Sequence, residues 1–275
     1  YNISIQMNVS DTTTNTAEYI RSLRTNGKYA FTIDDLVRDI PKPLKNIRKN
    51  LDNLREKGDI INVRRGFFAI IPDEYKNMGV IPVEFYIDVL MKYLCKNYYV
   101  GLYSASMFHG AAHQQPQEFY VISEKPRPKT TTNENYLINF IEKRNFPLFG
   151  IEKKKTDTGY FNISSKELTF LDMIYFEQAM GGFNRIISIL DELSESINLT
   201  KMKEAVKNDF PLSVYQRAGY IAENVLENTK LATIFENKLA KSNHRTKLLS
   251  SSGKKSGEKN GKWNLIINTE IESDL

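Results

Sequence analysis

Residues 42–65 combine a helical repeat of apolar residues with a cluster of positive charge. Leu44, Ile47, Leu51 and Leu54 recur three and four residues apart, the spacing that places side chains on one face of a helix. The other face carries mostly cationic and amide side chains: Lys45, Asn46, Arg48, Lys49, Asn53 and Glu56. The sequence therefore predicts an amphipathic helix that begins near Pro43, ends at Gly58 and packs its leucine side into a small core.

Two shorter helices and a hairpin are predicted around this helix. Asn15 and Glu18 form a capping box for a helix over 15–26, and Thr32 with Asp35 forms another for a helix over 33–40. After Gly58, apolar and polar residues alternate on both sides of Arg64-Arg65-Gly66, as in two strands joined by a tight tip. This order is typical of a winged helix-turn-helix.

The charge of the chain supports a nucleic-acid interface in this region. Residues 42–65 hold eight basic and three acidic residues, whereas the rest of the chain holds 30 of each. Clustered Lys and Arg neutralise DNA phosphates, and the N-terminal part of a recognition helix reaches base edges. We expect base contacts from Lys45, Asn46, Lys49 and Asn53. We expect phosphate contacts from Lys42, Arg48, Arg64, Arg65 and the helix N-terminus at Thr32.

The length of 275 residues predicts two domains, at roughly 150 residues each. We expect an α+β protein, with a winged helix-turn-helix domain over 1–78 and a larger mixed α/β domain, rich in helices, over 79–275. Residues 1–14 are expected to be flexible, and residues 1–6 to be a trimmed or added leader before Met7. The single Cys95, the absence of a long apolar run and the start "YNISIQM" predict a cytoplasmic protein with no membrane span.

The second part of the chain reads as helices and strands in mixed order. Two helices are expected within 82–116, the first with Phe85, Val89, Leu90 and Leu94 buried and the second over about 102–112, and a short helix is expected over 135–144. Strands are expected at 118–123 and on either side of the turn 156–159. A later helix is expected to start at a capping box of Ser164 and Glu167. Further expectations are an Arg217–Asp172 pair, a mobile loop at 250–262 and Trp263 as the anchor of a terminal strand.

Residues that could carry chemistry are few. His109 and His113 have the spacing of some zinc ligands, but Cys95 is the only thiol, so packed or surface histidines are the preferred interpretation. Ser104 or Ser106 near His109 lacks the glycine pattern of a nucleophile turn. Glu152 and Lys154 match a short element of many nucleases. We expect no catalytic residues, no metal site and no cofactor.

Several short segments, in order, resemble the AbiEi family of antitoxins from bacterial abortive-infection operons. They are "GLYSASMFHG" (101–110), "FPLFG" (146–150), "SSKELTFLDMI" (164–174), "YQRAGYI" (215–221) and "KWNLIINTEIESDL" (262–275). The resemblance implies a winged-helix repressor that binds inverted repeats of double-stranded DNA in its own promoter. It also implies a partner, a nucleotidyltransferase toxin of the AbiEii type, counteracted directly or indirectly in phage defence. The Ser/Gly/Lys-rich segment before Trp263 departs from the family pattern.

Two other functions stay open from the sequence. One is a winged-helix regulator whose C-terminal domain senses a small ligand. The other is a nucleic-acid-processing enzyme that uses Glu152 and Lys154.

Overall fold

The fold is that of a computed structural model, which describes residues 15–112, 118–133, 136–208 and 210–271. The segment 1–14 and His113 lie outside the described residues. Contacts divide the chain into two compact units. The first comprises the described residues up to Tyr93 with Asn133 and Lys155–Gly159, and the second comprises the remainder. The residues expected at the start of the second domain, 79–93, therefore cluster with the first unit.

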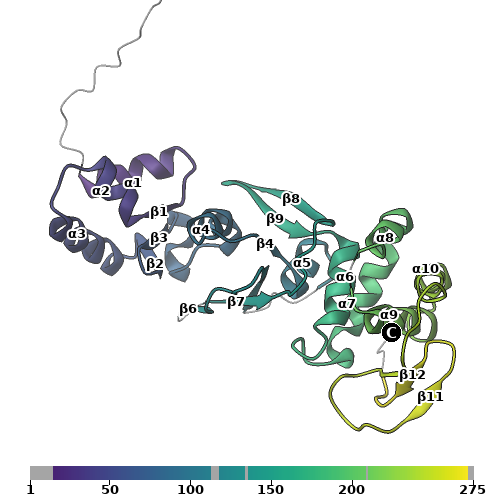
Figure 1. The fold of residues 1–275 in the computed structure, drawn as a ribbon. Coiled ribbons are helices and arrows are strands. Elements are labelled where there is room, and N and C mark those ends of the chain that lie inside the picture. The colour runs from purple at the N-terminus through teal and green to yellow at the C-terminus, as the bar shows by residue number, and fades with distance from the viewer. Residues whose placement is uncertain (1–14, 113–117, 134–135, 209, 272–275) are drawn as a thin grey trace, which may run out of the picture. The chain divides into compact units, whose positions relative to one another are not determined.

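The first unit places three helices beside a small sheet (Figure 1). The elements follow in the order α1 (Thr16–Thr25), β1 (Ala30–Thr32), α2 (Ile33–Asp39), α3 (Leu44–Glu56), β2 (Ile60–Arg64) and β3 (Phe67–Ile70). The three strands form an antiparallel sheet of order β1-β3-β2. Two short 3-10 turns, η1 (Asp73–Met78) and η2 (Val83–Phe85), lead to α4 (Ile87–Tyr93).

Both helix caps expected from the sequence are present. Asn15 accepts from the backbone of α1 while its own N–H donates to Glu18 at 3.1 Å. Thr32 Oγ1 accepts from Asp35 N at 3.1 Å, and Thr32 N donates to Asp35 Oδ2 at 2.9 Å. Each box satisfies backbone donors that a helix start leaves open, and so defines where the chain enters the helix.

The second unit is built on a six-stranded mixed sheet. Its order is β6-β7-β5-β4-β9-β8, in which β4 pairs antiparallel with β5 but parallel with β9, and β5 pairs parallel with β7. The strands are β4 (Tyr98–Val100), β5 (Glu118–Ser123), β6 (Thr131–Asn133), β7 (Tyr136–Glu142), β8 (Ile151–Thr156) and β9 (Gly159–Ser164). The short helix α5 (Leu102–Phe108) connects β4 toward β5.

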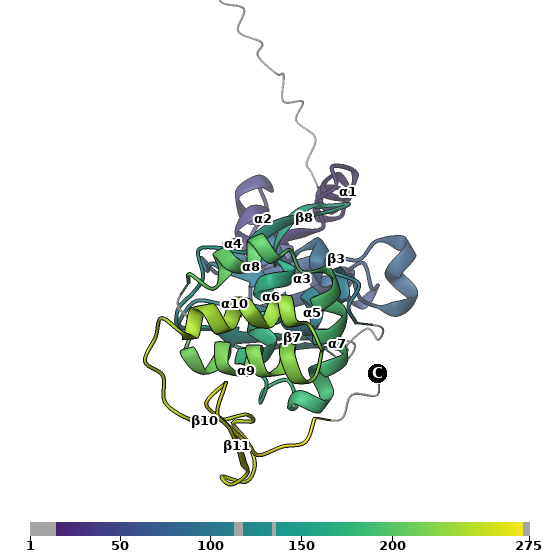
Figure 2. The same cartoon turned by 90° about the vertical axis from the view of Figure 1, so that its right-hand side faces the viewer.

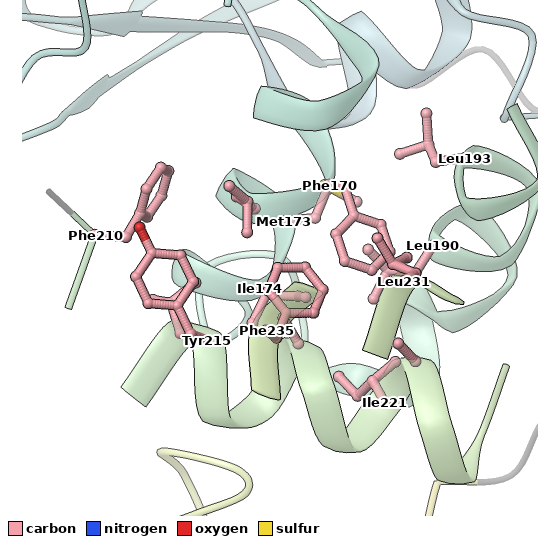
Figure 3. Close-up of a cluster of buried hydrophobic side chains, with 14 of the residues drawn as sticks. Phe170, Met173, Ile174, Leu190, Leu193, Phe210, Tyr215, Ile221, Leu231 and Phe235 are labelled. Carbon is pink, nitrogen blue, oxygen red and sulfur yellow. The ribbon is translucent and has the colours of Figure 1, made fainter. Parts of the chain in front are cut away.

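A helical layer supplies the main core of this unit. Its helices are α6 (Lys166–Tyr175), α7 (Phe183–Ser196), α8 (Leu199–Ala205), α9 (Leu212–Asn224) and α10 (Thr229–Leu239). Helices α9 and α10 lie side by side (Figure 2). Phe170 of α6, Tyr215 of α9 and Phe235 of α10 meet in this core with near-parallel rings, at centroid distances of 6.4 Å for both pairs that include Phe235 (Figure 3).

A three-stranded sheet follows the helices. Its order is β10-β12-β11, formed by β10 (Lys247–Leu248), β11 (Glu258–Asn260) and β12 (Leu265–Ile267). Trp263 before β12 is fully buried, and its Nε1 donates to Glu223 Oε2 at 2.7 Å. Its ring fills the notch left by Gly219 in α9, where a Cβ would come within 1.8 Å of the indole. The expectation that Trp263 anchors this strand is confirmed.

One helix expected in the second part is wrong, and another is shorter than expected. Residues 135–144 contain strand β7, in which Ile138 and Phe140 are fully buried while Leu137, Asn139 and Ile141 are half-buried. This alternation is the period of a strand. The first helix expected within 82–116 is α4, which covers only Ile87–Tyr93, so Phe85 and Leu94 lie outside it while Leu90 is buried as expected. Val89, expected in the core, is 43% exposed.

Three local expectations also need correction. The helix expected over 102–112 ends at Phe108. The cap of α6 is Ser165 rather than Ser164, because Ser165 Oγ accepts from Leu168 N, and Glu167 instead accepts from Asn198 N at 2.9 Å. Arg217 does not pair with Asp172. Its Nε donates to the carbonyl of Leu248 at 3.2 Å.

No helix among the described residues has the length and apolar content needed to cross a bilayer.

Candidate nucleic-acid interface

Helix α3 divides its residues between a core side and a solvent side. Ile47 and Leu51 are 0% and 3% exposed and pack with Leu36 and Phe68. Leu54 is half-buried against the same cluster. The residues expected to face a duplex from this helix are all exposed, namely Lys45, Asn46, Arg48, Lys49 and Asn53. The helix therefore presents one continuous polar side while two residues hold it in place.

Leu44 does not join the core side that the spacing predicted. It is the first residue of α3 and is 40% exposed. An apolar side chain thus stands next to Lys45 and Asn46 at the N-terminal end of the helix. The helical repeat places Leu44 on the apolar face of α3. It is not buried because the first turn of the helix extends beyond the packed core.

The N-terminal end of α3 favours anions. Pro43 precedes the helix, and its carbonyl accepts from Asn46 N at 2.9 Å and Ile47 N at 3.2 Å. The first turn of α3 contains no acidic residue. Free backbone N–H groups and the helix dipole make such an end electropositive, and Lys45 adds a full charge beside it.

The hairpin β2–β3 has a tip that the structure holds in place. Gly66 adopts φ +78°, a left-handed conformation that suits glycine, and its carbonyl accepts from Ile33 N at 2.9 Å. Tyr93 Oη donates to the carbonyl of Arg65 at 3.2 Å. The pairing register shifts between Asn62 and Arg64, as at a β-bulge. Arg65 is exposed at the tip, and Arg64 is half-buried on β2.

The two remaining predicted site residues lie at the helix boundaries. Lys42 is half-buried in the link between α2 and α3, and its N–H donates to the carbonyl of Ile40 at 2.8 Å. Thr32 donates its hydroxyl to Asp35 Oδ2 at 2.7 Å. With Asp34 also in the first turn of α2, a phosphate there would meet two carboxylates. This end is therefore a poorer anion site than the start of α3.

Several acidic side chains of the first unit form ion pairs with basic side chains of the same unit. Arg38 pairs with Asp35 at 3.0 Å and with Asp39 at 2.8 Å. Arg24 pairs with Asp73 at 2.7 Å, and Lys76 bridges Asp73 and Asp59 at 2.9 and 2.8 Å.

Hydrogen bonds from Arg24 and Lys76 lower the pKa of Asp73 to about 2. The carboxylate therefore stays charged, and the pairs link α1, the start of β2 and the 3-10 turn η1.

Other residues considered for chemistry have structural partners. Glu152 Oε1 pairs with Lys201 Nζ at 2.9 Å, and Lys154 Nζ donates to the carbonyl of Phe108 at 3.2 Å. His109 Nε2 lies 2.7 Å from the carbonyl oxygen of Ser164, and burial lowers its pKa. Among the described residues, no group of three or more His, Cys, Asp or Glu side chains is placed to hold a metal ion.

A second basic stretch escaped the sequence analysis. Residues 241–262 carry seven basic residues and one acidic residue. Acidic residues elsewhere in the chain balance these seven basic residues. The number of basic residues outside 42–65 therefore equals the number of acidic ones. A count in a sliding window of about twenty residues separates the two stretches.

Comparisons with known proteins give a family match and a structural match. The family model described as "AbiEi antitoxin C-terminal domain" matches residues 99–224. Among solved structures, the chain is similar to the RV2827C protein from Mycobacterium tuberculosis, with a TM-score of 0.61 and 13% sequence identity. That match covers 91% of this chain and 90% of the other, and at this identity it shows the fold alone. Comparison with curated proteins finds no match.

Proposed function

We propose, from the premise that the chain is an AbiEi family antitoxin through its residues 99–224, that its first unit is a winged-helix module which represses its own toxin–antitoxin operon. Antitoxins of this family act on a toxin partner, and the chain carries the family's C-terminal domain. The DNA target and the residues that contact it are proposed from the first unit and from the chemistry of its surface. The kind of toxin is proposed from the family resemblance carried by the second unit.

The exposed polar side of α3 is the single observation that carries the DNA-binding part. A major groove admits one helix, and residues near its N-terminus reach base edges. Lys45, Asn46 and Lys49 occupy that end of α3 and are exposed, while Ile47 and Leu51 fix the helix from the other side. Lys can donate to guanine O6 and N7, and Asn can pair with adenine at two points. Asn53 lies two turns further along and would contact the groove's edge.

Phosphate contacts are assigned to the flanks of this helix. These contacts are assigned to basic residues on both sides of the groove-facing side chains in the sequence. Lys42 precedes α3, Arg48 lies on it, and Arg64 and Arg65 follow it on the hairpin. The held tip of the hairpin suits a wing, because an arginine on a fixed turn loses less conformational freedom on binding than one on a mobile loop. Thr32 is left outside the interface because its hydroxyl is engaged by Asp35.

A gel-shift assay with the promoter of the chain's own operon tests this part. Lys49→Glu is expected to abolish specific binding at fixed salt, because it places a carboxylate against the groove. Lys57→Glu makes the same charge change at the C-terminal end of α3, where Lys57 is also exposed, and is expected to weaken binding much less. Equal affinities of the wild type and Lys49→Glu would contradict the proposed reading helix.

The antitoxin part predicts that the chain counteracts a nucleotidyltransferase toxin of the AbiEii type. Co-expression with the adjacent reading frame should rescue growth that the toxin alone arrests. Lys49→Glu should still rescue when both genes are expressed from foreign promoters, because neutralisation is assigned to the second unit. Size-exclusion of the two purified proteins, alone and mixed, distinguishes direct binding from indirect counteraction.

One observation favours a second candidate, a regulator that senses a small ligand. The second unit has a cavity of about 400 Å³ lined by Lys143, Arg144, Asn145, Tyr175, Phe210 and Pro211. Because Lys143 is paired with Asp172 at 2.5 Å, Arg144 is the cation that this lining offers, and with the two aromatic rings it suits an anion that carries a flat ring. A ligand of this class that raises the thermal midpoint and shifts operator affinity, with both effects lost in Phe210→Ala, would establish this function.

A further inference from the structure

The segment 241–262, named here the C-terminal basic segment, is the strongest concentration of charge in the second unit. Its basic residues are Lys241, Arg245, Lys247, Lys254, Lys255, Lys259 and Lys262, and its one acidic residue is Glu258. The surplus of six positive charges exceeds that of residues 42–65. The DNA contacts proposed for α3 and the hairpin do not involve this segment.

The part of the segment between β10 and β12 consists largely of small, exposed residues. Residues 251–259 are all exposed, and apart from the lysines and Glu258 they are serine and glycine. Arg245 and Lys247, which precede them, are exposed as well. In the described part of the chain, Lys262 alone among the seven basic residues forms ion pairs, with Glu223 and with Glu236.

Hydrogen bonds hold this surface in one conformation. Asn268 Nδ2 donates to the carbonyls of Ser250 and Lys254, at 3.1 and 2.9 Å, and Asn268 Oδ1 accepts from Ser250 N at 2.9 Å. Glu177 accepts from Ser251 N at 2.8 Å. Gly257 passes so close to β12 that a Cβ would lie 2.0 Å from the carbonyl oxygen of Ile267. The loop that the sequence analysis expected to be mobile thus has backbone contacts to β12, to the residue that follows it and to Glu177.

We propose that the C-terminal basic segment binds the phosphate backbone of nucleic acid, independently of base sequence and of helix α3. Lysines on a fixed, small-residue loop can approach a line of phosphates without steric hindrance from neighbouring side chains. Each phosphate that they neutralise releases a counterion, which favours binding at low salt. No aromatic side chain lies in 251–259 to stack on bases, so the contact is to the backbone.

A membrane surface fits this segment less well than nucleic acid. Stable attachment of a peripheral protein to lipid combines cations with apolar side chains that enter the bilayer. The large apolar side chains that are exposed in the described residues all lie before residue 161, so none accompanies these lysines. The second unit therefore offers a polyanion-binding surface without a lipid anchor.

The test uses the full chain with Lys49→Glu already present, so that the reading helix does not contribute. Binding of a random-sequence duplex and of a structured RNA is measured by fluorescence anisotropy over a salt series. Lys254→Glu/Lys255→Glu is expected to weaken binding of at least one of them by about tenfold or more at low salt. It should also reduce the slope of log K against log salt by about two, because each lost phosphate contact removes about 0.9.

The matched control is Lys203→Glu/Lys230→Glu, which makes the same change of net charge at exposed lysines of α8 and α10. Equal losses in the two double variants would overturn the proposal, since they would reflect net charge alone. Unchanged binding of both nucleic acids, with loss of binding only to anionic vesicles, would overturn it as well. If binding is lost for only one of the two nucleic acids, that one is the ligand of the C-terminal basic segment. If Lys49→Glu left operator affinity unchanged, the proposed role of α3 would be refuted. The effect of Lys254→Glu/Lys255→Glu would still test the C-terminal basic segment separately.

Discussion

Lys143 and Asp172 form an ion pair inside the second unit, with Lys143 Nζ 2.5 Å from Asp172 Oδ1 and both side chains almost without solvent contact. Tyr99 Oη donates to Asp172 Oδ2 at 2.7 Å, and the Lys143 ammonium lies 4.0 Å from the centre of the Phe210 ring. Burial raises the pKa of the Asp172 carboxyl, and Lys143 and Tyr99 oppose that shift. The pair joins the end of β7 to helix α6 across the core.

Removing one partner of this pair should be costly. Asp172→Ala leaves the ammonium of Lys143 buried without its counter-charge, which costs about 3–5 kcal/mol in comparable sites. Lys143→Met/Asp172→Leu removes both charges and keeps apolar volume, so its loss should be much smaller. Urea unfolding of the three proteins measures the difference. A double variant as unstable as Asp172→Ala would show that packing, and not the uncompensated charge, dominates.

The two arginines at the hairpin tip should contribute affinity for DNA without selectivity, as the proposed wing requires. Arg64→Ala/Arg65→Ala is expected to weaken binding to operator and to random duplexes by a similar factor. The slope of log K against log salt should fall by about one to two, at about 0.9 per phosphate contact. Titrations at several salt concentrations measure it. An unaltered slope would exclude a phosphate role for the hairpin tip.

Leu44 is expected to read thymine methyl groups in the operator. Apolar contact with the thymine methyl is one form of groove readout. Replacing the contacted thymine by deoxyuridine should weaken wild-type binding by about 0.8 kcal/mol, roughly fourfold, the value of one buried methylene. The same replacement should not affect Leu44→Ala, while Val37→Ala, which alters another exposed apolar residue on α2, should behave as wild type. Equal uridine effects in wild type and Leu44→Ala would rule the contact out.

The Asp73 pairs predict an acid-dependent loss of stability in the first unit. The folded pKa of Asp73 is about 2, below its ordinary value of 3.8, because Arg24 and Lys76 donate to it. A depressed pKa contributes stability that is complete above the unfolded value and lost as the pH falls toward the folded one. The urea midpoint of the wild type should therefore exceed that of Asp73→Asn at pH 6, and the difference should shrink between about pH 4 and pH 2. If the difference in urea midpoint stayed constant from pH 4 to pH 2, the charge of the Asp73 carboxylate would not be its cause.

The first unit was predictable from the sequence because its signals are local. The capping boxes at Asn15 and Thr32, the glycine at 66 and the spacing of Ile47 and Leu51 each act within a few residues, and each has the expected geometry. Leu44 is the exception. Its spacing matches the apolar face, but only tertiary packing decides how far along a helix the core extends.

The second unit was less predictable because its elements depend on distant partners. Strand β7 is apolar enough to pass for a short helix, and only its pairing with β5 selects the extended form. The partner of Arg217 is the carbonyl of Leu248, a backbone group that side-chain chemistry does not reveal. Asp172 instead meets Lys143, whose approach requires the strand that the sequence analysis read as helical.

The packing of helix α3 has a consequence for how the proposed DNA-binding surface can diverge. Its attachment depends on Ile47 and Leu51, while the side chains assigned to the duplex make no contribution to the interior. In the proposed DNA-binding role, substitutions on the outward side can therefore change the preferred promoter with little loss of folding stability. Duplicated copies of such a gene could acquire separate targets, and so avoid silencing one another's operons, before any buried residue has to change.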